Sequence, residues 1–326
     1  MNLNGRENQT LSLPNGRVLG YAEYGYPNGF PVFIFHGFPS SRLEAFPVDR
    51  IARRRRLRII ALDRPGFGLS TLQPHRRITD WPADVMAIAR DTHIDRFAVL
   101  GVSGGAPYAL ACAHALPHEM LSAVGVLAGA PPWEAGPQYM PWYSRATSWA
   151  ATYWPTGFGA VTNALVAIIR WIMTTGPVTR WIDKLLESVK KAKKESTAAE
   201  DDLGLEEDVQ PTTAERRERL IRLGFEGFAQ GSEGFVQEAQ LLSAQDWGFK
   251  FEDIDYDPIK IWHGSQDANA PVRMIRYMAK RLPHSVLHEF KGDTHFTMFK
   301  YFGQVFSELV PEEVLQKPSE AASNQV

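Results

Sequence analysis

The first 130 residues contain several nearly continuous apolar runs, each ending in a glycine, serine or aspartate. Short runs without polar alternation are typical of strands that are covered on both faces, as in a parallel sheet. Stretches with helical character separate them, at 78–94 and 105–116. Strand and helix in alternation predict an α/β sheet. The runs are PVFIFHG (31–37), RIIALD (58–63), FAVLGVS (97–103) and AVGVLAG (123–129).

The alternation stops near Ala130 and resumes after about residue 245. The sequence between these two parts, residues 131–245, predicts helices and loops and is rich in tryptophan. We therefore expect a sheet domain formed by 1–130 and 246–310, a helical lid at 131–245 and a flexible tail at 311–326. Inside the lid, the polar and charged stretch at 190–212 predicts a mobile, solvated segment.

Composition narrows the class of protein. The 326-residue chain has a net charge of −2 and is 44% hydrophobic, which is typical of a folded globular protein with no bias toward nucleic acid. The single cysteine, Cys112, excludes an intramolecular disulfide, and no apolar signal core follows the N-terminus, so we expect a cytoplasmic protein. The apolar run at 159–173 is interrupted by Asn163 and Arg170, so we expect no stable membrane insertion.

The strongest chemical signal is the stretch Gly101-Val102-Ser103-Gly104-Gly105, which fits the G-x-S-x-G nucleophile elbow. Such a turn holds its serine in a strained backbone conformation, and side chains at the flanking glycines would collide with neighbouring chain. A chain of this length matches the motif by chance about one time in ten. The position of the motif, after an apolar run and before a helical stretch, makes Ser103 the candidate nucleophile.

A serine hydroxyl needs a base to take its proton, and histidine is the usual base near neutral pH. His295 follows the last predicted strand, which places it at the same sheet edge as Ser103. A carboxylate must then fix the tautomer of the histidine. We prefer Asp267, in the loop after the preceding strand, to its local rival Asp293. The order Ser103, Asp267, His295 is the order of this elbow class.

Two backbone amides complete the candidate site. The oxyanion formed in acyl transfer needs rigid donors, and N–H groups held by the fold serve well. We expect one donor from Gly104, next to the nucleophile, and the other from Phe38, in the loop after the 31–37 run.

At these residues the sequence resembles the α/β-hydrolase superfamily. The resemblance rests on HGFP at 36–39, DRPGFGLS at 63–70 and the elbow, and it extends from about Leu11 to Leu309. It implies an eight-stranded, mostly parallel sheet with helices on both faces, a helical lid, and no cofactor or metal. It also implies the triad of Ser103, Asp267 and His295 and an oxyanion hole from Phe38 and Gly104. Relatives that open epoxides or cleave carbon–halogen bonds carry aspartate at the elbow, so serine points to acyl transfer.

Other polar residues of these motifs have structural interpretations. We expect Asp63 and Arg64 to pair with each other and shape the turn near the site. We expect His36 to brace the oxyanion loop and Arg42 to form an ion pair.

The aromatic residues of the lid predict the kind of substrate. Some would be buried to keep the lid folded, and others would line an apolar pocket above Ser103. This predicts a hydrophobic small-molecule substrate. The apolar run at 159–173 leaves two further interpretations open, contact with a membrane and a homodimer through the lid. The first candidates for substrate binding are Trp133, Tyr139, Trp142 and Tyr143.

Three functions are compatible with these residues. The first is a serine hydrolase that cleaves an ester, lactone or related acyl bond through an acyl-enzyme. The second is an acyltransferase or carbon–carbon bond hydrolase that uses the same triad. The third is a ligand receptor or template protein with little hydrolysis. The complete set of elbow, triad and oxyanion residues favours the first, although fold alone does not decide the substrate.

Overall fold

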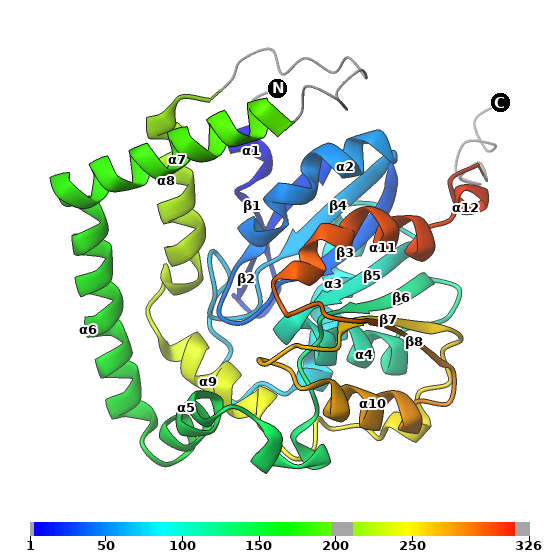
Figure 1. Ribbon diagram of the computed structural model, residues 1–326. Coiled ribbons are helices and arrows are strands. Elements are labelled where there is room, and N and C mark those ends of the chain that lie inside the picture. The colour runs from blue at the N-terminus through cyan, green and yellow to red at the C-terminus, as the bar shows by residue number, and fades with distance from the viewer. Residues whose placement is uncertain (1–2, 197–210, 317–326) are drawn as a thin grey trace.

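The computed structural model describes residues 3–196 and 211–316 (Figure 1). The described residues form one central sheet of eight strands in the order β1-β2-β4-β3-β5-β6-β7-β8. The strands are β1 (Gln9–Ser12), β2 (Val18–Gly25), β3 (Phe30–Phe35), β4 (Leu57–Leu62), β5 (Phe97–Val102), β6 (Leu121–Leu127), β7 (Ile259–Gly264) and β8 (Ser285–Phe290).

Strands β3 to β8 pair in parallel, whereas β1 pairs with β2 and β2 with β4 in antiparallel fashion. The prediction of an eight-stranded, mostly parallel sheet is therefore confirmed. Central strand β5 is buried along its whole length, which explains why its sequence is apolar without alternation. Because parallel strands share one direction, the loops that follow β3, β5, β7 and β8 meet at one edge of the sheet.

Helices cover both faces of the sheet (Figure 1). One face packs against α3 (Trp81–Asp91), α4 (Ala106–Ala115) and α10 (Val272–Arg281). The opposite face packs against α2 (Asp49–Arg54) and α11 (Phe302–Leu309). Successive strand residues point to opposite faces, so each central strand contributes apolar side chains to both cores.

All described elements between β6 and β7 are helices, and we call the described residues of this stretch (128–196 and 211–258) the insertion. Its helix α9 lies beside the sheet, and α6 lies at the outer edge of the molecule (Figure 1). The α-helices are α5 (Trp142–Tyr153), α6 (Pro155–Thr174), α7 (Gly176–Ser196), α8 (Thr213–Phe225) and α9 (Glu233–Leu242).

Two stretches expected to be mobile include helical residues. The charged stretch 190–212 begins inside α7, which ends at Ser196, while residues 197–210 lie outside the described residues. The terminal stretch 311–326 contains the short helix α12 (Glu312–Gln316), and residues 317–326 lie outside the described residues. A short helix, α1 (Leu3–Arg6), precedes the first strand.

Candidate active site

Ser103 occupies a sharp turn between β5 and α4. Its φ of +49° lies in the left-handed region, which a non-glycine residue rarely adopts. The two outer glycines of the motif are required by close approach: a Cβ on Gly101 would lie 2.5 Å from the Gly105 carbonyl oxygen, and one on Gly105 would lie 2.1 Å from the Phe35 carbonyl oxygen. Only glycine fits at both positions, so the motif is an elbow in three dimensions.

The three residues predicted as a triad form a hydrogen-bonded chain. His295 Nδ1 lies 2.7 Å from Asp267 Oδ2, and His295 Nε2 lies 3.0 Å from Ser103 Oγ. Since an ionised carboxylate only accepts hydrogen bonds, Nδ1 carries the proton and Nε2 is left to accept from the Ser103 hydroxyl. The second oxygen of Asp267, Oδ1, accepts from the backbone N–H groups of Asn269 at 2.9 Å and Ala270 at 2.7 Å.

The rival carboxylate, Asp293, makes a separate set of contacts. Its oxygens accept from Thr297 Oγ1 at 2.8 Å, Lys300 Nζ at 2.6 Å and Tyr301 Oη at 2.7 Å. The hydrogen bonds from Lys300 and Tyr301 lower the pKa of Asp293 to about 2. The Asp293 carboxylate is thus bound by residues that follow it in the chain. The carboxylate that contacts His295 is that of Asp267, in the loop after β7.

The backbone of Phe38, after β3, lies directly against the elbow. A Cβ on Gly104 would lie 2.8 Å from Phe38 Cβ and 3.1 Å from Phe38 N, so the residue after Ser103 must be small for this approach. Within the described residues, no hydrogen bond uses the Phe38 N–H. This amide is therefore available to a ligand oxygen beside Ser103.

The two residues before Phe38 are held by charged side chains. Gly37 N–H donates to Glu44 Oε2 at 2.7 Å, and Arg64 Nη2 donates to the Gly37 carbonyl at 2.9 Å. Arg64 Nη1 also donates to the carbonyl of His36. His36 braces the same loop: its Nδ1 donates to Gly37 O at 2.7 Å, and its Nε2 accepts from Arg64 N–H at 3.2 Å. Burial and the charge of Arg64 lower the pKa of His36, which keeps the ring neutral.

Arg64 takes its ionic partner from the insertion. The ion pair joins Arg64 Nε to Glu238 Oε1 on α9 at 2.8 Å, and both side chains are fully buried. Glu238 also pairs with Arg76 and accepts from Tyr108 Oη at 2.7 Å. Burial raises the pKa of Glu238, but the charges of Arg64 and Arg76 outweigh burial and leave the pKa below its usual value.

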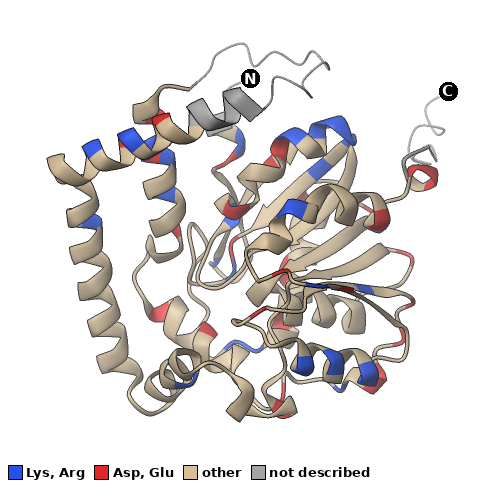
Figure 2. Cartoon of the chain, viewed as in Figure 1, with Lys and Arg blue, Asp and Glu red and all other residues tan. Residues whose placement is uncertain are grey.

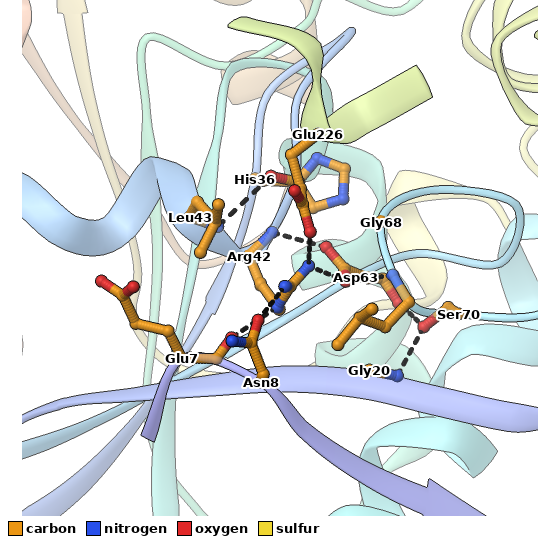
Figure 3. Close-up of polar contacts among 12 residues, drawn as sticks. Glu7, Asn8, Gly20, His36, Arg42, Leu43, Asp63, Gly68, Ser70 and Glu226 are labelled. Atoms are coloured by element: carbon orange, nitrogen blue, oxygen red, sulfur yellow. Dashed lines mark hydrogen bonds and ion pairs between the residues drawn. The ribbon is translucent and has the colours of Figure 1, made fainter. Parts of the chain in front are cut away.

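The expected pairing of Asp63 with Arg64 is therefore wrong. Asp63 pairs instead with Arg42, whose Nη1 lies 2.9 Å from Asp63 Oδ2 (Figure 3). Arg42 Nη1 also lies 2.7 Å from Glu226 Oε1, at the end of α8, and Arg42 Nε donates to the Glu7 carbonyl at 2.6 Å. Arg42 thus has the structural role expected of it. Together, Glu226 and Glu238 tie the insertion to the loops after β3 and β4.

The four aromatic residues predicted to bind substrate pack beside α10 or lie at the surface of the insertion. Trp133 and Tyr139 pack with Met140 and Met274, beside α10. Trp142 is exposed, and the Tyr143 hydroxyl donates to Asn269 Oδ1 at 2.5 Å. Among the described residues, no hydrogen bond or ring contact joins these four side chains to Ser103, Phe38 or His295. Their role in substrate binding stays a prediction.

Other residues of the insertion, outside these four candidates, contact the loop that carries Phe38. The ring of Phe235 stacks on Phe38 with 4.9 Å between centroids, and Phe158 contacts Phe235 at 5.7 Å. A Cβ on Gly104 would lie 3.3 Å from Leu242 Cδ1. Phe235 and Leu242 are seven residues apart on α9 and so share a face of that helix. The sequence shows the seven-residue spacing, but it does not show which surface this face of α9 would cover.

Glu44 is a residue that sequence reasoning missed. A Cβ on Gly37 would lie 3.3 Å from both Glu44 Oε1 and Ser103 Cβ, so the carboxyl borders the space beside the nucleophile. Burial raises the pKa of Glu44.

No group of three or more His, Cys, Asp or Glu side chains that could hold a metal ion occurs among the described residues.

Comparison with known proteins extends these findings. Residues 32–308 match the sequence model of the alpha/beta hydrolase family. No curated protein matches the chain. Similar solved structures include an esterase from Exiguobacterium antarcticum, with a TM-score of 0.61 and 18% identity over 94% of this chain and 99% of that chain. The enol-lactonase from Burkholderia xenovorans LB400 gives a TM-score of 0.59 and 15% identity, covering 92% of this chain and 99% of that chain. A bromoperoxidase from Bacillus anthracis gives a TM-score of 0.55 and 19% identity, covering 93% of this chain and 99% of that chain. At such identities the likeness establishes the shared fold.

Proposed function

Because the chain belongs to the alpha/beta hydrolase family, we propose that it is a serine hydrolase that cleaves an ester, lactone or related acyl bond of a hydrophobic small molecule. One observation carries the proposal: the hydrogen-bonded chain from Ser103 through His295 to Asp267, set beside the Phe38 amide. These are the parts that acyl transfer needs, namely a nucleophile, a base, a carboxylate that orients the base, and a donor for the oxyanion.

The first half of the reaction follows from this arrangement. Ser103 Oγ attacks the acyl carbon while its proton passes to His295 Nε2, and Asp267 stabilises the imidazolium. The carbonyl oxygen becomes an oxyanion that accepts from the N–H groups of Phe38 and Gly104. The tetrahedral intermediate then collapses, the bond to the leaving oxygen breaks, and the imidazolium protonates that oxygen. The products are an acyl ester of Ser103 and an alcohol.

The second half repeats the same steps with water. His295 takes a proton from a water molecule, the resulting hydroxide attacks the acyl carbon, and the oxyanion occupies the same site. When the intermediate collapses, the bond to Ser103 Oγ breaks, the proton returns to that oxygen, and a carboxylic acid leaves. An acceptor alcohol or amine in place of water would give acyl transfer, so the difference between the two functions is decided at this step.

The insertion serves, in this proposal, as a lid that supplies the apolar wall of the substrate site. The support comes from the side chains that meet the oxyanion loop: Phe235 and Phe158 extend the apolar surface of Phe38, and Leu242 borders Gly104. Apolar walls with a few placed polar groups are typical of small-molecule sites. We therefore assign the substrate an apolar acyl or aromatic group next to the scissile bond.

Hydrolysis of a series of p-nitrophenyl esters, from acetate to decanoate, tests the proposal. The wild type should hydrolyse longer acyl chains faster than acetate, and Ser103→Ala should reduce the rate by at least about 10³-fold. A strong preference for acetate would contradict the apolar wall. Activity that survives in Ser103→Ala would contradict the proposed nucleophile. Product analysis with an added alcohol then separates hydrolysis from acyl transfer.

A further inference from the structure

Helix α6 carries an exposed apolar stripe on its outer side. The stripe consists of Val161, Leu165, Ile168, Ile169 and Ile172, and each of these side chains is between 41% and 52% exposed. Their spacing of four, three, one and three residues puts them on one face of the helix, over a length of about 16 Å. We call these five residues the outer stripe.

The side of α6 that packs on the insertion is not the outer stripe: Phe158 contacts Phe235 with 5.7 Å between ring centroids, and the Gly159 carbonyl accepts a hydrogen bond from Ser232 Oγ. A hollow of about 390 Å³ borders a further side of α6 and is lined by polar and apolar residues together: Asn163, Val166, Ala167, Arg170, Trp171, Thr174 and Phe228. Arg170 lies over the ring of Phe225, with 5.4 Å to its centroid. A surface helix normally turns its apolar side to the protein and its polar side outward. The outer stripe is therefore apolar surface that the described residues leave exposed, and an exposed apolar patch marks an interaction site.

Aromatic residues flank the outer stripe at both ends. Tyr153 and Trp154 precede α6 and are exposed, and Trp171, near the end of α6, is exposed and also lines the hollow. Trp149 on α5, before the outer stripe, and Trp181 on α7, after it, are also exposed. Aliphatic residues bounded on both sides by tryptophan and tyrosine match the arrangement at a membrane–water boundary, where these amphipathic rings sit at the level of the headgroups.

The charge of this part of the chain fits an anionic surface. Residues 135–182 contain three arginines, Arg145, Arg170 and Arg180, and no lysine, aspartate or glutamate, so their net charge is +3. The whole chain has a net charge of −2, which leaves −5 for all other residues. Figure 2 shows α6 almost free of charged residues along its length. Arg170 lies over Phe225, but Arg145 and Arg180 are exposed: anionic headgroups would neutralise them, whereas a second copy would bring the same positive charges together.

From these observations we infer that the insertion docks on an anionic phospholipid surface, with the outer stripe in the acyl boundary and the flanking aromatic residues at the headgroups. This inference goes beyond acyl hydrolysis and does not depend on it, because docking requires no turnover.

Docking along the surface accounts for α6 better than a membrane span does. By length and composition α6 could cross a membrane. Both of its ends, however, continue into helices that pack within the insertion: Ser148 of α5 bonds to Ser243, and Asp183 of α7 pairs with Arg217 of α8. The inner side of α6 packs on α9 through Phe158 and Phe235. A helix held in this way lies in the plane of the interface, in keeping with the expectation of no stable insertion.

Vesicle flotation tests the inference on the full chain. Wild-type protein should float with vesicles of phosphatidylcholine and phosphatidylserine, and more weakly with phosphatidylcholine alone. The variant Leu165→Glu/Ile168→Glu should lower the bound fraction at least tenfold, since binding follows the buried apolar area of the helix. The control Val286→Glu changes an equally exposed apolar side chain on β8 and should float like the wild type. Ser103→Ala should also float, which separates docking from the proposed activity.

Three results would overturn the inference. The first is a wild type that does not float with the anionic vesicles. The second is a Leu165→Glu/Ile168→Glu variant that floats as well as the wild type while keeping its circular dichroism spectrum. In the third, light scattering finds a wild-type dimer that the same variant converts to a monomer, and the dimer does not float. A second copy would then cover the outer stripe.

Discussion

Arg64 and Glu238 form a fully buried ion pair, with 2.8 Å between Arg64 Nε and Glu238 Oε1, that connects the insertion to the loop carrying Phe38. Arg64 donates to the carbonyl oxygens of His36 and Gly37, the two residues before Phe38. Glu238 thereby holds the Arg64 side chain, which in turn holds the loop of His36, Gly37 and Phe38. The insertion therefore helps to support the candidate site through Glu238.

The variant Glu238→Gln tests this positioning role. Removing one partner of a buried ion pair should lower the free energy of unfolding by about 3 kcal/mol. If Arg64 positions the loop, kcat should fall about tenfold with little change in KM, because the oxyanion donor is used in the transition state. The control Glu289→Gln removes an exposed partner of Arg276 and should change neither quantity measurably. Loss of stability with unchanged kcat would show that the ion pair is structural only.

The variants Asp267→Asn and Asp293→Asn separate the two candidate carboxylates. Asp267 accepts from His295 Nδ1, and an amide there would favour the wrong tautomer of the ring, so kcat should fall by about 10³- to 10⁴-fold. Asp293 contacts Thr297, Lys300 and Tyr301, so Asp293→Asn should cost stability while keeping most of kcat. Steady-state kinetics on one ester suffice. Equal losses of kcat would contradict the assignment.

Gly104→Ala tests the approach of the Phe38 amide to the elbow. The added methyl group would meet Phe38 Cβ at 2.8 Å and Phe38 N at 3.1 Å, and so must displace the loop. Displacing one oxyanion donor should lower kcat by about 10²-fold. Gly224→Ala is the matched control, because nothing lies within 4 Å of the new methyl group on α8. It should leave kcat unchanged and raise stability by up to about 1 kcal/mol.

The buried histidines predict how stability depends on pH. Burial lowers the pKa of His263, and burial and Arg64 lower that of His36, below the usual 6.5. Both rings therefore stay neutral in the folded chain but take up a proton in the unfolded chain below about pH 6.5. Each should make the free energy of unfolding decrease with falling pH, by up to about 1.4 kcal/mol per pH unit.

Urea unfolding of the wild type and His263→Gln at pH 7 and pH 5.5 measures this effect. The variant lacks one of the two groups, so its free energy of unfolding should fall less between the two pH values. The raised pKa of Glu44 acts in the opposite direction above pH 4.5, but it is common to both proteins and cancels in the comparison. Identical pH dependence in both proteins would contradict the neutral state of folded His263.

Much of the fold, and the meeting of Ser103, His295 and Asp267, could be predicted from the sequence because the signals are local. An apolar strand leads into the Ser103 turn, and the loops after the last two strands carry Asp267 and His295. Parallel strands then bring those loops to one edge without further information. The cytoplasmic location and the role of the lid aromatics, including Trp142, stay predictions.

What the sequence could not predict depends on partners far along the chain. Asp63 and Arg64 are adjacent, yet their ionic partners are Arg42 and Glu238. Both faces of α6 contain apolar residues, so only the fold shows that the outer stripe faces outward. The pairing of distant charges and the choice of helix face are set by tertiary packing, which local patterns do not encode.

The most direct test of the proposed nucleophile is covalent labelling with a fluorophosphonate, read by intact mass and peptide mapping. The reagent reacts with a serine hydroxyl that a neighbouring base activates. The account predicts one adduct per chain, on Ser103, with no adduct in Ser103→Ala and much slower labelling in His295→Ala. A folded wild type that takes up no label, or a Ser103→Ala variant labelled as fully as the wild type, would contradict it.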